Sequence, residues 1–272
     1  VFIGTVVGAG LASGQEIAQF FSTYGYKSFL GLLICFVLCI MVSKIVIHIS
    51  IKYNLGSYKD LINLVMPGYL GRLIDILTSL FLISSAAIIL AGSGALLHQY
   101  FNLNKWVGII FMIIASLIVL LRDTKGLIEL NSLTVPCLII VITTLFLLYT
   151  LVYKNINFSC MVNAPCYKSF WIPSSILYCS FNLLSSTGVI VALTKEFREE
   201  RLIFNGIILG SLVLTFLSFI INFILILNMP YIFKYEIPLL YVSNRFGKLM
   251  EALLLGIIWC EMFSTEVDRK ST

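Results

Sequence analysis

Charged residues are scarce in this sequence: they make up 11% of its 272 residues, whereas 60% of the residues are hydrophobic. A soluble domain of this length is about a quarter charged and roughly half apolar. A water-soluble fold could not bury this much apolar surface, so the composition predicts an integral membrane protein with the lipid bilayer as its solvent. The basic residues are spread along the chain, and we expect no nucleic-acid partner.

Histidine is also scarce, with only His48 and His98 in the chain. The seven cysteines form no Cys-x-x-Cys pair, so a zinc site is not expected. The sequence has no His-Glu-x-x-His motif, and we expect neither an enzyme nor an organic cofactor. Cys160 and Cys166 share one polar loop; they could form a disulfide in an oxidising space or remain unpaired.

Long apolar runs dominate the rest of the chain. A spanning helix needs about 20 mainly apolar residues, and eight runs are candidates: Val1–Phe21, Ser28–Ser50, Tyr69–Gln99, Lys105–Leu121, Gly126–Val152, Phe170–Leu193, Leu202–Asn228 and Lys248–Val267. We therefore predict an all-α integral membrane bundle with one transmembrane domain over residues 1–272. The chain opens inside an apolar run with no initiator methionine or signal peptide, so we expect it to be part of a longer protein.

Two connections between these runs are more than turns. Gly56–Pro67 has apolar residues at helical spacing between charges, which favours a short interfacial helix. Met229–Gly247 is apolar, but Pro230 and Pro238 break it, so we expect a hairpin or a re-entrant cap packed on the bundle. Lys and Arg are more frequent in the loops after even-numbered runs, which favours a multi-pass protein of the cell membrane with a cytoplasmic N-terminus.

The first run contains a dense group of glycines, Gly4, Gly8, Gly10 and Gly14, followed by Gln15 and Glu16. Glycine is a poor helix former, and unwound backbone at membrane depth is tolerated only beside protein or a wet cavity. Its amides would then face an anionic group of a solute. Alternatively, the glycines let two helices pack closely, since Gly10 and Gly14 form a Gly-x-x-x-Gly pair. No strand precedes this segment, which argues against a nucleotide-binding loop.

Val7-Gly8-Ala9-Gly10-Leu11 resembles the Gly-x-Gly signature in the first helix of the amino acid–polyamine–organocation superfamily, and VGAGLASGQE is similar to its YkvI-like bacterial membrane proteins. This resemblance implies the leucine-transporter-type fold of two inverted repeats of five helices. Residues 1–153 would hold helices 1–5, residues 170–272 would hold helices 6–8, and the last two helices would be missing. It also implies that amides around Gly8, Ala9 and Gly10 hold a solute carboxylate, and that the sixth run is broken like the first.

The sixth run has an unusually polar middle, YCSFNLLSSTG, from Tyr178 to Gly188. Asn182 is costly in lipid unless it has a partner. We therefore expect Phe181, Asn182 and Ser185 to line the solute site. The alternative is that the hydroxyl groups bond to their own backbone while Asn182 joins two helices.

The eighth run places Ser264 and Thr265 three and four residues after Glu261, on one helix face. By resemblance to sodium-coupled members of the superfamily, Na⁺ would be bound by the carbonyls of Gly4, Val7 and Glu261 and by the hydroxyls of Ser264 and Thr265. The carboxyl of Glu261 departs from that pattern, and it could instead be a proton site. The carboxyl of Glu16 is a second possible proton site.

These features together predict ion-coupled uptake of an amino acid or a similar small solute by alternating access, with either Na⁺ or H⁺ as the coupling ion. A bundle of the first, second, sixth and seventh helices would rock against the others. The alternative is a non-transporting nutrient receptor, such as a germinant receptor, on the same scaffold. The sequence predicts neither the identity of the solute nor the oligomeric state.

Overall fold

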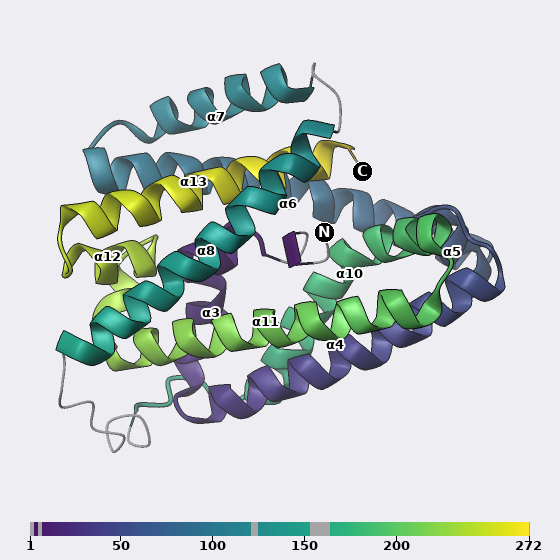
Figure 1. Ribbon diagram of the computed structural model, residues 1–272, viewed down its shortest axis with the longest axis horizontal. Helices are drawn as coiled ribbons and strands as arrows, with labels where there is room; N and C mark the ends of the chain where they lie inside the picture. Colours follow the sequence, from purple (N-terminus) through teal and green to yellow (C-terminus); the bar gives the residue numbers. More distant parts are fainter. Residues whose placement is uncertain (1–2, 5–6, 121–124, 153–163, 272) are drawn as a thin grey trace.

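In the computed structural model the chain is a bundle of long helices (Figure 1). It describes residues 3–4, 7–120, 125–152 and 164–271, and every regular element in these ranges is helical. The long helices are α4 (Lys27–Lys52), α6 (Tyr69–Phe101), α7 (Lys105–Leu120), α8 (Lys125–Val152), α10 (Trp171–Phe197), α11 (Glu200–Leu227) and α13 (Lys248–Ser271). The predicted all-α class is confirmed for this part of the chain.

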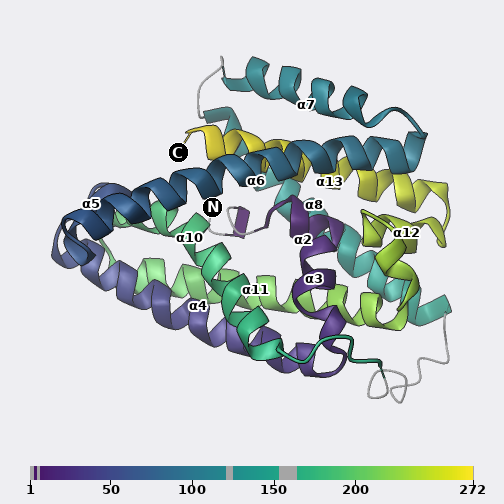
Figure 2. The same ribbon diagram turned by 180° about the vertical axis from the view of Figure 1, so that it is seen from behind.

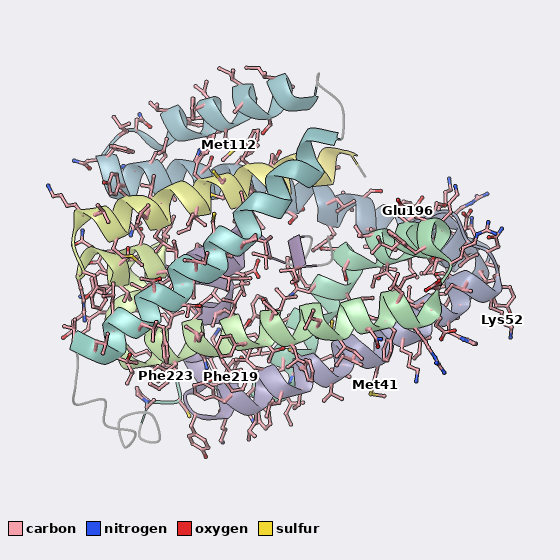
Figure 3. The ribbon with its side chains drawn as sticks, viewed as in Figure 1. Met41, Lys52, Met112, Glu196, Phe219 and Phe223 are labelled. Atoms are coloured by element: carbon pink, nitrogen blue, oxygen red, sulfur yellow. The ribbon has the colours of Figure 1, made fainter. Side chains whose placement is uncertain are left out.

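Five stretches are long and apolar enough to cross a membrane: α4, α6, Thr134–Val152 of α8, α10 and α11. On α4, Leu30, Leu33, Val37, Met41 and Ile45 are exposed at helical spacing, and Met41 extends away from the bundle in Figure 3. Such an apolar stripe is stable in lipid and unfavourable in water. The chain is therefore a multi-pass helical membrane protein.

Three of the eight predicted spans differ from expectation. The predicted span Lys248–Val267 forms helix α13, but no stretch of its described residues is among the five that could cross a membrane. Helix α7 is apolar, but its apolar stretch, Lys105–Ile118, is too short to cross a membrane. The run from residue 1 to residue 21 is not one helix. Its described part consists of a helical pair at residues 3–4, then α2 (Ala9–Ser13), α3 (Gln15–Phe20) and the 3₁₀ helix η1 (Ser22–Tyr24). This interrupted N-terminal segment replaces the first predicted spanning helix.

The long helices form two groups. In the first helix group, α4 packs along both α10 and α11; in the second, α6 packs against α7 and α13. Helix α8 contacts α13 and α11 and so links the two groups. Figure 2 shows the interrupted segment between them, where α2 packs on α13 and α3 packs on α10 and α11. Short helical pieces therefore lie between the two groups of long helices.

The short helix predicted within Gly56–Pro67 is present as α5 (Tyr58–Val65). The hydroxyl of Ser57 accepts a hydrogen bond from the amide of Asp60 at 3.3 Å, and the Asp60 carboxylate accepts one from the amide of Gly56 at 3.1 Å. This reciprocal capping satisfies amides that have no partner within the helix. Lys52 and Glu196 lie at the same end of the bundle as α5, where nitrogen and oxygen atoms concentrate in Figure 3.

The predicted cap is also present, as the 3₁₀ helix η2 (Tyr231–Lys234) and helix α12 (Pro238–Asn244). Its apolar residues Ile232, Leu239, Leu240 and Val242 are completely buried, and α12 packs against α2, α3 and α13. The side chain of Gln99, on α6, donates to the carbonyl of Ile237 at 3.2 Å and accepts from its amide at 3.1 Å. The cap is thus tied to the second helix group by a pair of hydrogen bonds.

Candidate solute-binding cavity

A cavity of about 360 Å³ lies beside the interrupted N-terminal segment. Residues of α2, α3, α6, α10 and α13 line it, so both helix groups contribute. Six residues singled out in the sequence meet here: Gly8, Ala9, Gly10, Glu16, Phe181 and Thr265. They come from three regions that are far apart in the chain.

The backbone changes direction twice along this cavity. Gly8 is extended, with φ −99° and ψ 177°, and its carbonyl accepts the first hydrogen bonds of α2, from the amides of Leu11 and Ala12 at 3.1 Å each. Gly14 then adopts the left-handed conformation, with φ 77° and ψ 0°, between α2 and α3. Glycine reaches this conformation without the steric cost that a β-carbon brings. The helix interruption expected near Gly8 is therefore present, and a second one follows at Gly14.

The break at Gly14 brings the side chain of Glu16, on α3, against α2. The side chain of Glu16 lies against the α-carbon of Gly10, and a β-carbon at Gly10 would overlap the Glu16 carboxyl. Glu16 is half-buried, while Gln15 and Gln19 beside it are exposed, so the cavity is open on this side. The absence of a side chain at Gly10 is what lets a carboxyl group occupy the cavity wall.

Tyr178, on α10, packs against the end of α3. Its ring centroid is 5.5 Å from that of Phe20 and 5.0 Å from that of Phe21, and its side chain is near those of Glu16 and Asn182. Sequence reasoning missed Tyr178, although a tyrosine in an apolar helix needs a polar partner.

Helix α10 is continuous from Trp171 to Phe197, so the expectation that it is broken like the first run is wrong. The side chain of Asn182 donates to the carbonyl of Tyr178 at 3.0 Å, and that of Ser185 donates to the carbonyl of Phe181 at 3.3 Å. These bonds to residues one turn earlier leave the helical ladder intact. The Ser185 hydroxyl therefore bonds to its own backbone, as in the alternative interpretation, but Asn182 also bonds within its own helix and not to a second one as that interpretation had it.

Only one of the three residues predicted on α10 lines the cavity. Phe181 does, whereas Asn182 lines a smaller hollow of about 60 Å³ between α4, α10 and α11, together with Cys35, Cys39 and Cys179. Ser185 is not among the residues described at either hollow. Of the two loop cysteines, Cys160 lies outside the described residues, and the exposed Cys166 donates its thiol to the carbonyl of Tyr24 at 3.2 Å.

The predicted Na⁺ ligands are brought partly together. The methyl group of Thr265 lies 3.8 Å from the position of a β-carbon on Gly8, so α13 contacts the interrupted segment directly. The hydroxyl of Thr265 donates to the carbonyl of Glu261 at 2.7 Å. Ser264 is buried, and the fully buried carboxyl of Glu261 lies beside the Thr134 hydroxyl of α8. The ion site with the carbonyls of Gly4 and Val7 stays a prediction.

A second hollow of about 330 Å³ adjoins the cavity and shares Ser13, Gln15, Ile88, Gly92 and Met262 with it. Its far wall includes Lys105 and Glu236, whose ammonium and carboxylate groups are 2.6 Å apart. Both side chains are about half exposed, at 47% and 53%. The adjoining hollow thus leads from the cavity to an ion pair at the surface of the described protein, next to the cap.

Apolar helices surrounding an interrupted segment and its cavity define a polytopic α-helical membrane protein. The chain is similar to two proteins of Bacillus subtilis (strain 168). It is 28% identical over 267 residues to the uncharacterized membrane protein YkvI, which covers 98% of this chain and 76% of YkvI. It is also 28% identical over 272 residues to the uncharacterized protein YyaD, again covering 98% of this chain and 76% of YyaD.

These similarities support the resemblance to YkvI-like membrane proteins. No protein-family profile matches the chain. No solved structure matches it either. Membership of the wider transporter superfamily stays a prediction.

Proposed function

We propose that the protein is a secondary active transporter that takes up a small solute by alternating access, coupled to Na⁺ or H⁺. The observation that carries this proposal is the cavity of about 360 Å³ beside the interrupted segment. Ligand pockets of proteins begin at about 300 Å³, so the volume suits a small solute. Transporters commonly bind their solutes at discontinuous helices in the middle of the bundle.

The physical reason is the cost of free backbone groups in lipid. Each backbone polar group without a partner costs several kcal/mol in a bilayer, by rough estimate, so irregular backbone is retained only beside protein or a wet cavity. Gly8 and Ser13 both line the cavity, and Gly14 follows directly. Two breaks within seven residues are thus placed where a bound solute would meet them. We propose that amides near Gly8, Ala9 and Gly10 take part in solute binding.

For the scaffold we propose the five-plus-five inverted repeat of the amino acid–polyamine–organocation superfamily. The division into two helix groups supports it, because α4, α10 and α11 could move against α6, α7 and α13 on either side of the cavity. The continuous α10 departs from the two broken helices of that architecture. We further propose a cytoplasmic N-terminus, since α5 and the polar end of the bundle would then face the cytoplasm.

The test is binding followed by uptake, with the full-length natural protein. Purified protein is screened by thermal shift against amino acids and small amines, with and without Na⁺, and solutes that bind are offered to proteoliposomes carrying a Na⁺ or a pH gradient. We expect uptake only with a gradient. Binding without uptake would instead identify a nutrient receptor, and a protein that binds none of these solutes would overturn the proposal.

Thr265→Ala tests the Na⁺ site within the same assay. The variant removes one of the two proposed hydroxyl ligands, and we expect a weaker Na⁺ dependence of uptake. The matched control is Thr144→Ala on α8, where an exposed hydroxyl donates to the carbonyl of Ile140 at 2.7 Å, as the hydroxyl of Thr265 does to that of Glu261. Equal behaviour of the two variants would count against the Na⁺ site and leave proton coupling as the alternative.

A further inference from the structure

A hollow of about 700 Å³ lies between α4 and α11, at the end of the bundle where charged side chains concentrate (Figure 3). We call it the polar-end hollow. Its described lining consists of Lys44 and Ile47 of α4, Glu199 just before α11, and Glu200, Arg201 and Phe204 of α11. None of these residues lines the solute cavity or the adjoining hollow. Two basic and two acidic groups therefore surround an opening that is separate from the proposed solute site.

Three of the four charged groups in this lining are available to a ligand. Glu200 is already engaged, because its carboxylate lies 3.5 Å from Nδ1 of His48. The ion pairs of the described residues include none of Lys44, Glu199 and Arg201. The hollow thus offers two cations and one carboxylate to a single ligand.

Exposed apolar side chains continue from the hollow along both helices. Helices α4 and α11 pack side by side (Figure 1), and the ammonium group of Lys44 lies 5.5 Å from the centroid of the Phe204 ring. Met41 and Val37 follow Lys44 at helical spacing on α4, and Leu212 lies two turns after Phe204 on α11. All three are more than half exposed, and such side chains are stable against acyl chains. A molecule bound here would meet charges at one end and apolar surface at the other.

We propose that the polar-end hollow binds a phospholipid whose headgroup carries both a phosphate and a primary ammonium, as in phosphatidylethanolamine. Lys44 and Arg201 bind the phosphate, Glu199 accepts a hydrogen bond from the ammonium, and the acyl chains lie along α4 and α11. A lysine at this level keeps its stem on apolar surface while its ammonium group reaches the headgroups. The inference goes beyond the proposed transport function and does not depend on it.

The mixed charge of the lining distinguishes this lipid from others. Phosphatidylglycerol brings the phosphate but no cation, so the carboxylate of Glu199 repels it. Phosphatidylcholine brings a cation, but its quaternary nitrogen has no N–H to donate to that carboxylate. Phosphatidylethanolamine matches both charges and supplies the donor. We therefore expect it to bind in preference to the other two.

The experiment offers equal amounts of the three lipids, all with dioleoyl chains, to delipidated full-length protein in detergent. Native mass spectrometry counts the lipids bound. We expect phosphatidylethanolamine to be bound about two- to fivefold more than either competitor, the range for one exposed charge pair. Equal binding of the three lipids, or a preference for phosphatidylglycerol, overturns the inference. This comparison uses the wild-type protein, so it decides the matter even if a variant fails to fold.

Two variants separate the two halves of the headgroup. Lys44→Gln should lower the binding of all three lipids about fivefold, because it removes a contact to the phosphate that they share. Glu199→Gln should retain phosphate binding and abolish the preference for phosphatidylethanolamine over phosphatidylglycerol. The controls are Lys27→Gln, whose ammonium group lies 6.0 Å from the ring centroid of Tyr26 at the opposite end of α4, and Glu196→Gln, at an exposed carboxylate outside the lining. Controls that change lipid binding as much as the test variants would show a general effect of charge and overturn the site.

Soluble phosphoethanolamine tests whether the acyl chains are needed. It carries the same phosphate and ammonium groups without the apolar part. We expect an excess of it to leave the bound lipid in place, because the chains contribute to binding along α4 and α11. Displacement of the lipid would instead identify a site for a soluble headgroup and overturn the assignment to a lipid. None of these measurements involves a transported solute, so their failure leaves the proposed transport function standing.

Discussion

The carboxyl of Glu16 occupies the space that a β-carbon on Gly10 would fill. Two residues six positions apart are therefore matched in shape: the larger one enters the cavity wall only because the smaller one has no side chain. The left-handed Gly14 makes this contact possible by interrupting the helix between α2 and α3. The glycines of this segment thus have separate roles, one in backbone conformation and one in providing space.

Gly10→Ala should leave the protein folded and still change the wall of the cavity. The overlapping atoms run from Cγ to the carboxyl of the Glu16 side chain, which must adopt another rotamer to make room. The carboxyl would then leave its place beside Gly10, so we expect the affinity for a solute found by the thermal-shift screen to fall about tenfold. Calorimetry measures this, with Gly206→Ala as control, because a β-carbon there meets no atom within 4 Å. Unchanged solute affinity in a folded Gly10→Ala protein would contradict the placement of Glu16.

Gly14→Ala should destabilise the fold. Gly14 has φ 77°, and a β-carbon there would lie 2.8 Å from Cγ of Leu239 in the buried cap. Backbone strain and overpacking each cost about 1–3 kcal/mol, so we expect a clear fall in the midpoint of thermal unfolding in detergent. Gly256→Ala, in the interior of α13 with open space around it, is the matched control and should stabilise by up to about 1 kcal/mol. Similar shifts of the unfolding midpoint for the two variants would contradict the left-handed conformation of Gly14.

Asn222→Ala should also destabilise the protein, through its buried polar contacts. The side-chain carbonyl of Asn222 accepts from the hydroxyl of Ser22 at 2.9 Å, and its amide donates to Ser28 at 2.7 Å. All three residues are buried, so each lost bond costs about 1 kcal/mol or more. We expect a loss of about 2 kcal/mol in the free energy of unfolding, measured by denaturant titration. Ser180→Ala, at an exposed hydroxyl of α10, is the control, and an equal effect would show that the network is unimportant.

Acidification should loosen α5. Hydrogen bonds from the Ser57 side chain and the Gly56 amide lower the pKa of Asp60 below its ordinary value. A lowered pKa means that the folded helix binds the ionised form more favourably, so this stabilisation is complete above the ordinary value of about 3.9 and is lost as the pH falls through the lowered pKa. Hydrogen exchange of residues 58–65, corrected for the intrinsic pH dependence, should accelerate below about pH 4. Asp60→Asn should remove this acid dependence; a variant that keeps it would exclude Asp60 as the cause.

The helices were predictable because lipid demands long apolar stretches, and these are plain in the sequence of α4, α6, α10 and α11. The interruption near Gly8 was predictable from glycine density. The predicted break in α10 was wrong, because Asn182, Ser185 and their neighbours look alike in sequence whether they line a cavity or bond to their own helix. The contact of Asn222 with Ser22 spans 200 positions and depends on tertiary packing, which no local pattern encodes.

The side-chain amide of Gln99 donates one hydrogen bond to the backbone of Ile237 and accepts another from it. Because the two bonds end on a single residue, one rotation of the Gln99 side chain releases both of them together. These bonds act together with the buried apolar side chains of the cap, so a substitution of Gln99 would remove both polar ties at once and leave the apolar packing in place.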